Sequence, residues 1–183
     1  MANTVKTGRD EIICAALGII EERGEEDVSV RTIARRLGIS TQPIYREFGD
    51  MDSVMRAVKQ RGYDIWWEYL KGGAEDQAAR YVMFAVERGK LFKFLMRGGM
   101  EKKSSMVELA HSLMPSSDII KRLMDITGLD EETTYDLHLK LWLALHGLAV
   151  MAADGIISPS SDEVKAFVRE MTTELAIGKR GKK

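Results

Sequence analysis

Apolar residues recur with a helical period through most of the chain. The first predicted helix carries Ile13, Ala16, Leu17 and Ile20 on one face, follows a T-x-x-D start signal at residues 7–10, and ends at Gly24. Further helices are predicted at residues 51–71, 75–88, 91–96, 115–127, 131–153 and 161–177. Because alternating strand patterns are sparse, the sequence predicts an all-α chain.

Residues 29–48 have the most distinctive pattern, which predicts two short helices joined by a tight turn. Gly38 suits the positive φ that ends the first helix, at about residue 37. Ser40 is expected to cap the second helix, and Pro43 is tolerated in its first turn. We expect Ile44 and Phe48 to be buried on its apolar face. The side chains of Thr41, Gln42 and Tyr45 would then face solvent. This arrangement matches a helix-turn-helix, whose second helix enters the DNA major groove.

The local distribution of charge favours DNA binding more than the net charge does. A net charge of -1 and an isoelectric point near 6.3 do not by themselves indicate a nucleic-acid binder. Within residues 29–48, however, Glu47 is the lone acid among Arg31, Arg35, Arg36 and Arg46. Such a local basic surface is sufficient for phosphate contacts, although Arg35 and Arg36 cannot both face DNA.

A long helix links this region to the rest of the chain. Gly49 ends the preceding helix, Asp50 is placed to cap the next one, and the glycine pair at 72–73 ends it. This pair is a candidate boundary between an N-terminal domain and the remaining helices. We assign residues 1–50 to a helix-turn-helix DNA-binding domain of three helices. Residues 51–183, with the linking helix, form a helical ligand-binding and dimerisation domain.

Positions 9–58 resemble the TetR/AcrR family of transcriptional regulators. The resemblance rests on an apolar first helix with Ala16 and Gly24, then VSVRTIARRLGIS, then IYREF, and a new helix after a short break. In many relatives a lysine begins that new helix, where it can meet a phosphate. Here Met51 lies in the segment Gly-Asp-Met-Asp, so only the backbone N–H groups of the helix start remain for this contact.

The candidate DNA contacts lie on the two short helices, where the resemblance also places them. Gln42 can pair with adenine, and Thr41 can offer a hydroxyl or a methyl group to a base. Tyr45 can place its hydroxyl on a phosphate, and further phosphate candidates are Ser29, Arg31, Thr32 and Arg46. The alternative is a solvated helix pair in a bundle, which the flanking pattern disfavours.

Aromatic and methionine side chains are abundant in the C-terminal part. Such side chains can line a pocket for an apolar ligand, and the family resemblance implies an effector pocket in this part of the fold. The candidate lining residues are Tyr63, Trp66, Trp67, Tyr81, Phe84, Phe92, Met96, Met100 and Met114. Core packing is the alternative for each of them.

The helices predicted at 131–153 and 161–177 have wide apolar faces. The first is apolar almost all round, so we expect one side to pack on its own subunit and the other on a copy across a two-fold axis. The family resemblance implies a four-helix dimer interface of this kind. The candidate interface residues are Leu141, Leu145, Leu148, Ala152, Val164, Phe167, Val168, Met171 and Leu175. A monomer with one central helix is the alternative.

Metal, redox and enzyme chemistry have little support in the sequence. His111, His138 and His146 lack acidic or cysteine partners at ligand spacing, so core or interface histidines are favoured. Cys14 is the only cysteine, and we expect it to be a buried, inert thiol. No phosphate loop or G-x-S-x-G motif is present, so neither an enzyme nor a cofactor is expected. Without a signal peptide or a segment long enough to span a membrane, a cytoplasmic protein is expected.

The sequence therefore predicts a dimeric, sequence-specific DNA-binding transcriptional regulator. We expect a repressor whose DNA affinity is lowered by a small apolar or aromatic effector. Effector binding would act on the linking helix through Tyr63, Trp66 and Trp67. Movement of this helix would alter the separation of the two recognition helices and so lower DNA affinity. The alternative is a helical ligand- or protein-binding module that no longer binds DNA.

Overall fold

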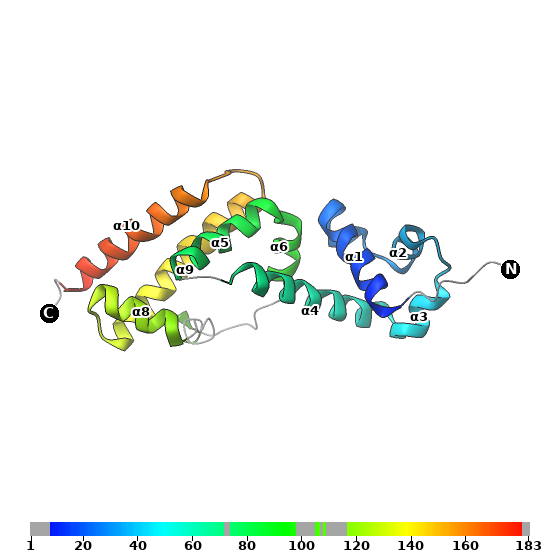
Figure 1. The fold of residues 1–183 in the computed structure, drawn as a ribbon, viewed down its shortest axis with the longest axis horizontal. Coiled ribbons are helices and arrows are strands. Elements are labelled where there is room, and N and C mark those ends of the chain that lie inside the picture. The colour runs from blue at the N-terminus through cyan, green and yellow to red at the C-terminus, as the bar shows by residue number, and fades with distance from the viewer. Residues whose placement is uncertain (1–7, 72–73, 98–104, 107, 109–116, 181–183) are drawn as a thin grey trace. The chain divides into compact units, whose positions relative to one another are not determined.

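The computed structural model describes residues 8–71, 74–97, 105–106, 108 and 117–180 of the 183-residue chain (Figure 1). All regular structure in these described ranges is helical, which confirms the predicted all-α class. The chain divides into two compact units, Met1–Tyr69 with Arg88–Gly99, and Leu70–Glu87 with Met100–Lys183. No helix within the described part combines the length and the apolar character needed to cross a bilayer.

Helix α1 (Arg9–Arg23) is the centre of the first unit. It packs against α2 (Val30–Leu37), α3 (Gln42–Phe48), α4 (Met51–Tyr69) and α6 (Gly89–Met96), and the short 3-10 helix η1 (Glu25–Asp27) follows it. The predicted single apolar face was too narrow, because contacts with these helices bury more of the surface of α1. Its buried residues are Ile12, Ala15, Ala16, Leu17, Ile19 and Ile20, whereas Ile13 is half-buried.

Two predicted details of α1 were wrong. Cys14 is exposed, because it lies on the polar side of the helix with the exposed Asp10 and Glu21. Gly8 is the N-cap of α1, and its backbone N–H donates to the Glu11 carboxylate at 3.0 Å, so the cap is not at the first residue of the expected T-x-x-D signal. Thr7 lies outside the described residues.

The turn between α2 and α3 follows the sequence prediction closely. Gly38 takes a left-handed φ of 67°, and the N–H of Ile39 donates to the carbonyl of Ala34 at 3.0 Å. Ile44 and Phe48 are buried on the inner face of α3. The prediction that Ser40 caps α3 was wrong, since Thr41 occupies the N-cap position and makes no side-chain capping bond there.

Helix α6 lies against α4 within the first unit. Gly62 of α4 is buried, and a Cβ atom there would lie 2.8 Å from Cδ2 of Leu95, so glycine permits the close approach. The Tyr63 hydroxyl donates to the carbonyl of Leu95 at 2.9 Å, and Nζ of Lys59 donates to that of Arg97 at 2.7 Å. These bonds satisfy carbonyl groups that a helix end leaves without intrahelical partners.

Charged side chains on and beside α6 also bond to the end of α1 and to η1. Arg88 forms an ion pair with Glu21, and Arg97 forms one with Glu25. Lys90 donates to the backbone carbonyl of Glu22, at the negative end of the α1 dipole. Thus α6, which follows α5 in sequence, completes the core of the first unit.

The second unit is built around α9 (Glu131–Ala153). This helix packs against α5 (Ala74–Glu87), α8 (Ser117–Thr127) and α10 (Ser161–Arg180). The Asp130 carboxylate caps α9 by accepting the N–H of Thr133 at 2.9 Å, and Ser160 with Glu163 forms the predicted capping box of α10. Part of the core consists of Leu137, Leu141 and Ala176, with Leu123, Leu129, Met171 and Leu175 packed around them.

Candidate nucleic-acid interface

The start of α2 is fixed by a reciprocal pair of capping bonds. The N–H of Thr32 donates to Oγ of Ser29 at 3.1 Å, and the N–H of Ser29 donates to Oγ1 of Thr32 at 2.8 Å. The Thr32 hydroxyl also donates to the carbonyl of Asp27 at 2.8 Å. Both side chains are half-buried, so their first role is to hold the start of α2.

Helix α3 presents a polar side to solvent. Gln42 is exposed in its first turn, and Tyr45 is 52% exposed one turn later. Thr41 is half-buried at the N-cap. Because Ile44 and Phe48 anchor the opposite side, Gln42 and Tyr45 are the α3 side chains best placed to reach a ligand outside the protein.

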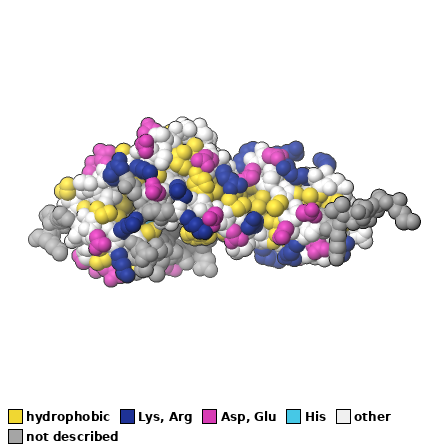
Figure 2. Space-filling view, viewed as in Figure 1, with side chains coloured by type: hydrophobic (Ala, Val, Ile, Leu, Met, Phe, Trp, Pro, Cys, Tyr) yellow, Lys and Arg dark blue, Asp and Glu magenta, His cyan; other side chains and the backbone are white. Residues whose placement is uncertain are grey.

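The four arginines within residues 29–48 have different surroundings. Arg36 makes a bidentate pair with Glu22 at 2.7 and 2.6 Å, which lowers the pKa of that carboxyl, so Arg36 holds α2 to α1. Arg31 and Arg35 are exposed, and neither has an ion-pair partner among the described residues. Arg46 is exposed, with Nε 3.3 Å from the Glu47 carboxylate. Figure 2 shows Lys and Arg side chains at the surface of this N-terminal part, at the right of the view.

The start of α4 is occupied by a carboxylate. Asp50 accepts the N–H of Ser53 at 2.7 Å, and this bond lowers the pKa of Asp50. One N–H group that was expected to be available to a phosphate is therefore already bonded. Arg56 donates to the Ser53 hydroxyl at 2.7 Å, which places a cation beside this helix start. Arg56 is not among the DNA contacts predicted from the sequence, although its three-residue spacing from Ser53 on a predicted helix indicates that the two side chains are neighbours.

The candidate pocket residues are divided between the two units. Tyr63, Trp66 and Trp67 lie on α4, where adjacent ring centroids are 6.2 and 5.1 Å apart. The first unit also contains Phe92 and Met96 on α6, and the second contains Tyr81 and Phe84 on α5. Phe84, Phe92 and Tyr81 are buried, whereas Trp67 is 58% exposed. Met100 and Met114 lie outside the described residues.

The candidate interface residues on α9 and α10 differ in burial. Leu141, Leu145 and Ala152 of α9 and Val164 of α10 are buried within the protomer itself, where α9 and α10 pack against each other and against α5. Leu148, Val168, Met171 and Leu175 are half-buried, and Phe167 is exposed. The exposed apolar side of α9 instead consists of Leu143, Val150 and Met151, with Gly147 between them. These positions share one helical face. This face was not among the interface residues predicted from the sequence.

The described histidines belong to the helical second unit. The Tyr81 hydroxyl lies 2.7 Å from Nδ1 of His146, and the Trp142 ring stacks on His146 with centroids 4.8 Å apart. Burial lowers the pKa of both His138 and His146. Within the described ranges, no three His, Cys, Asp or Glu side chains are grouped as metal ligands would be. His111 lies outside those ranges.

The arrangement of α1, α2 and α3 defines a helix-turn-helix domain. Residues 12–58 match the family model described as "Bacterial regulatory proteins, tetR family". The chain therefore carries the N-terminal domain of the TetR family, and the assignment made from the sequence is confirmed.

Curated proteins similar to this chain are described as helix-turn-helix transcriptional regulators. An HTH-type transcriptional regulator from Staphylococcus aureus strain USA300 is 31% identical over 94 residues, which are 51% of each chain. The chain thus spans about half the length of the curated relatives that it matches.

Solved structures support the fold over nearly the whole chain. A TetR-like transcriptional regulator from Rhodococcus sp. RHA1 has 17% identity and a TM-score of 0.61, covering 94% of this chain and 96% of that one. A TetR-family regulator from Streptomyces coelicolor has 21% identity and a TM-score of 0.61, covering 97% and 84%. A Rhodococcus sp. RHA1 protein of unknown function has 20% identity and a TM-score of 0.67, covering 96% and 98%.

Proposed function

We propose that the protein is a sequence-specific DNA-binding transcriptional regulator that reads base edges with α3. The observation that carries the proposal is the exposed side of α3, where Gln42 and Tyr45 face solvent within the segment that matches the TetR family. Buried Ile44 and Phe48 fix that side outward. A regulator of this kind would act on DNA in the bacterial cytoplasm.

Each candidate DNA contact receives a role from its surroundings. Gln42 and Thr41 would contact bases, whereas Tyr45, Arg31 and Arg46 would contact phosphates. Ser29 and Thr32 would act mainly by holding the start of α2, through the capping bonds described above. Because its guanidinium is paired with Glu22, Arg36 is left out of the DNA-binding set.

The test is a comparison of specific and general DNA binding. The wild-type chain first selects duplexes from a random pool, and the Gln42→Ala and Tyr45→Phe variants then bind duplexes changed one base pair at a time. We expect Gln42→Ala to cost about 1–3 kcal/mol at one base pair and to relax specificity there. Tyr45→Phe should weaken all duplexes by similar factors. If the wild-type chain binds no DNA even at low salt, the module without DNA binding replaces this proposal.

We also propose that two copies associate through the exposed side of α9. Leu143, Val150 and Met151 are apolar side chains exposed in the single chain, and Gly147 has open space around its Cβ position. An apolar face of this kind on a helix is suited to an isologous two-fold contact. Phe167 on α10 would extend the contact.

A small-molecule effector that lowers DNA affinity completes the proposed function. The support is the bonding of α6 to α4 through Tyr63 and Lys59, because a ligand that displaces α6 must break these bonds or move α4. The aromatic residues of α4 favour an apolar or aromatic effector. Titrating aromatic compounds and operator DNA together tests this, since each should weaken the other by the same factor. Independent affinities would contradict it.

A further inference from the structure

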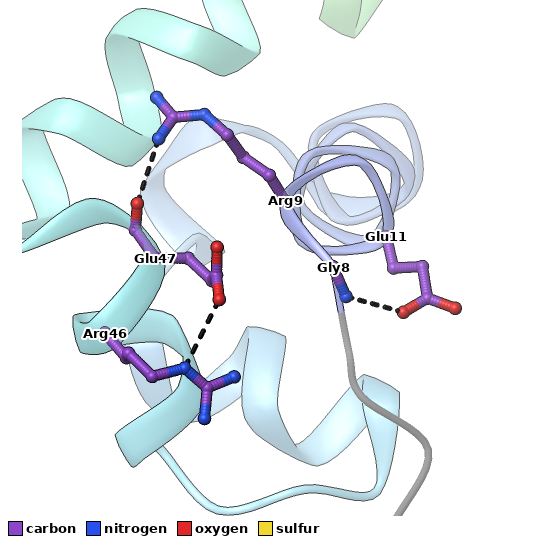
Figure 3. Close-up of polar contacts among 5 residues, drawn as sticks. All are labelled: Gly8, Arg9, Glu11, Arg46 and Glu47. Carbon is purple, nitrogen blue, oxygen red and sulfur yellow. Dashed lines mark hydrogen bonds and ion pairs between the residues drawn. The ribbon is translucent and has the colours of Figure 1, made fainter.

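The first residue of α1 reaches the end of the recognition helix. The bond from Gly8 N–H to the Glu11 carboxylate fixes the start of α1, and Arg9 is the next residue (Figure 3). Nη1 of Arg9 donates to the backbone carbonyl of Glu47 at 2.9 Å. Its Cζ atom lies 4.1 Å from the centroid of the Phe48 ring, over the face of that ring. Arg9 thus contacts both of the last residues of α3.

These contacts are chemically suited to an arginine. The last carbonyls of a helix have no intrahelical donors and carry the negative end of its dipole, so a cation there is stabilising. The guanidinium is also attracted to the aromatic face of Phe48, whose side chain is buried. One side chain therefore fixes both the backbone and a core ring at this end of α3.

The side chain of Glu47 extends the arrangement to a DNA-contact candidate. Its carboxylate lies 3.3 Å from Nε of Arg46. Figure 3 marks this contact with a dashed line. The backbone that Arg9 holds therefore also positions Arg46 and Tyr45, the residues that immediately precede Glu47 in α3. A shift of the C-terminal end of α3 would change the direction in which both side chains extend.

We propose that Arg9 is a positioning residue for DNA recognition, which fixes the C-terminal end of α3 against α1 without contacting DNA itself. The inference rests on the proposed DNA binding and goes beyond it, because Arg9 lies on α1, outside the two helices α2 and α3 that form the helix-turn-helix motif. It also precedes residues 12–58, the range that the family model matches. Its guanidinium is engaged by a carbonyl and a ring, so its effect on DNA reaches the duplex through α3.

The experiment uses the full chain with Arg9→Met and Arg9→Lys. Binding is measured over a range of salt to a duplex that the wild-type chain selects from a random pool, and to an unrelated duplex. Arg9→Met should weaken the selected duplex about five-fold or more, the effect of losing a cation at a helix end and over a ring. The unrelated duplex should be weakened by a similar factor, because Tyr45 and Arg46 would contact phosphates of any sequence. In a Tyr45→Phe background, Arg9→Met should cost less affinity than in the wild-type chain, because part of its effect acts through Tyr45. Arg9→Lys should restore most of the loss.

A matched control and a second readout separate positioning from general damage. Arg122→Met removes the same charge from an exposed site on α8, and DNA binding should not change. Amide hydrogen exchange of α3 should become faster in Arg9→Met alone, because the Glu47 carbonyl loses its donor. If Arg9→Met does not fold, Arg9→Gln, which keeps a donor but no charge, makes the same comparison.

The possible results distinguish positioning by Arg9 from direct DNA contact and from the absence of any role. If Arg9→Met costs as much affinity in the Tyr45→Phe background as in the wild-type chain, and the salt slope falls by about one further phosphate contact, Arg9 binds DNA directly and the proposal is overturned. Unchanged affinity for the selected duplex would also overturn it, while leaving the proposed DNA binding intact. A wild-type chain that selects no duplex would refute the proposed function, and this inference with it.

Discussion

The hydroxyl of Tyr81 lies 2.7 Å from Nδ1 of His146, a hydrogen bond that joins α5 to α9 inside the second unit. The Trp142 ring stacks on the same imidazole at an interplanar angle of 8°. Burial raises the pKa of Tyr81, so its hydroxyl stays protonated and can donate to a neutral imidazole. The geometry therefore favours the uncharged form of His146.

Acid should destabilise the second unit through its histidines. Burial lowers the pKa of His146 and His138, so the unfolded chain binds protons more readily than the folded one. The free energy of unfolding should therefore fall as the pH falls below about 6.5, the ordinary histidine value. Denaturant unfolding at a series of pH values measures this. The His146→Gln variant, which can still accept the Tyr81 hydroxyl, should show a weaker dependence over the same range; an unchanged dependence would exclude His146 as its source.

A methyl group at Gly62 should disturb the contact between α4 and α6. The added Cβ would lie 2.8 Å from Cδ2 of Leu95, which is itself fully buried. Overpacking of this kind costs about 1–3 kcal/mol, whereas alanine gains about 1 kcal/mol over glycine in a helix. We expect Gly62→Ala to lower the free energy of unfolding by about 1 kcal/mol, measured by denaturant unfolding.

The chain offers a matched control for Gly62→Ala. Gly178 is also helical, on α10, and has no atom within 4 Å of its Cβ position. Gly178→Ala should leave stability unchanged or raise it by up to about 1 kcal/mol. Equal effects at the two glycines would show that the close approach of α6 is unimportant.

Local patterns were sufficient to predict the helix-turn-helix. Its helices are short, the position of Gly38 marks the turn, and the spacing of Ile44 and Phe48 identifies the buried side of α3. Such signals act within one or two helical turns, so they can be recognised in the sequence without knowledge of the tertiary structure.

The position of α6 was not predictable in the same way. Leu91 and Leu95 indicate an apolar helix, but helical period alone does not identify the helix against which they pack. The ion pairs of Arg88 with Glu21 and Arg97 with Glu25 join residues far apart in sequence. Neither partner has a local pattern that points to the other.

The sides of α9 were ambiguous for a related reason. The helix is apolar almost all round, so its pattern does not separate the side facing its own protomer from the side left exposed. Burial within the protomer makes that distinction, by covering Leu141 and Leu145 and exposing Leu143 and Val150. The dimer itself stays a prediction.

Removing the acid of the recognition helix should strengthen general DNA binding. The Glu47 carboxylate lies beside Arg46, where it competes with phosphate for the guanidinium. Glu47→Gln keeps the backbone carbonyl that Arg9 contacts and removes the charge. We expect unrelated duplexes to bind about three-fold more tightly at low salt, with a steeper salt dependence, in fluorescence-anisotropy titrations. Unchanged binding would show that Arg46 does not reach a phosphate.

A charge on the exposed side of α9 should prevent self-association. Val150 is 39% exposed, and burying a glutamate at this position against a second copy would leave an unpaired charge in an apolar contact. We expect Val150→Glu to raise the dimer dissociation constant at least about ten-fold, because even one unpaired buried charge costs more than the corresponding 1.4 kcal/mol. Sedimentation equilibrium over a range of concentrations measures this constant.

The matched control for Val150→Glu is Ile126→Glu on α8. Ile126 is 70% exposed and lies outside the α9 face, so the same change of an exposed apolar residue to glutamate should leave association intact. Both variants should keep the helical content of the wild-type chain. Because two half-sites are bound by two recognition helices, Val150→Glu should also weaken binding to a palindromic duplex more than to a single half-site. A wild-type chain that is monomeric at all concentrations, or equal effects of the two variants, would rule out this face as the dimer contact.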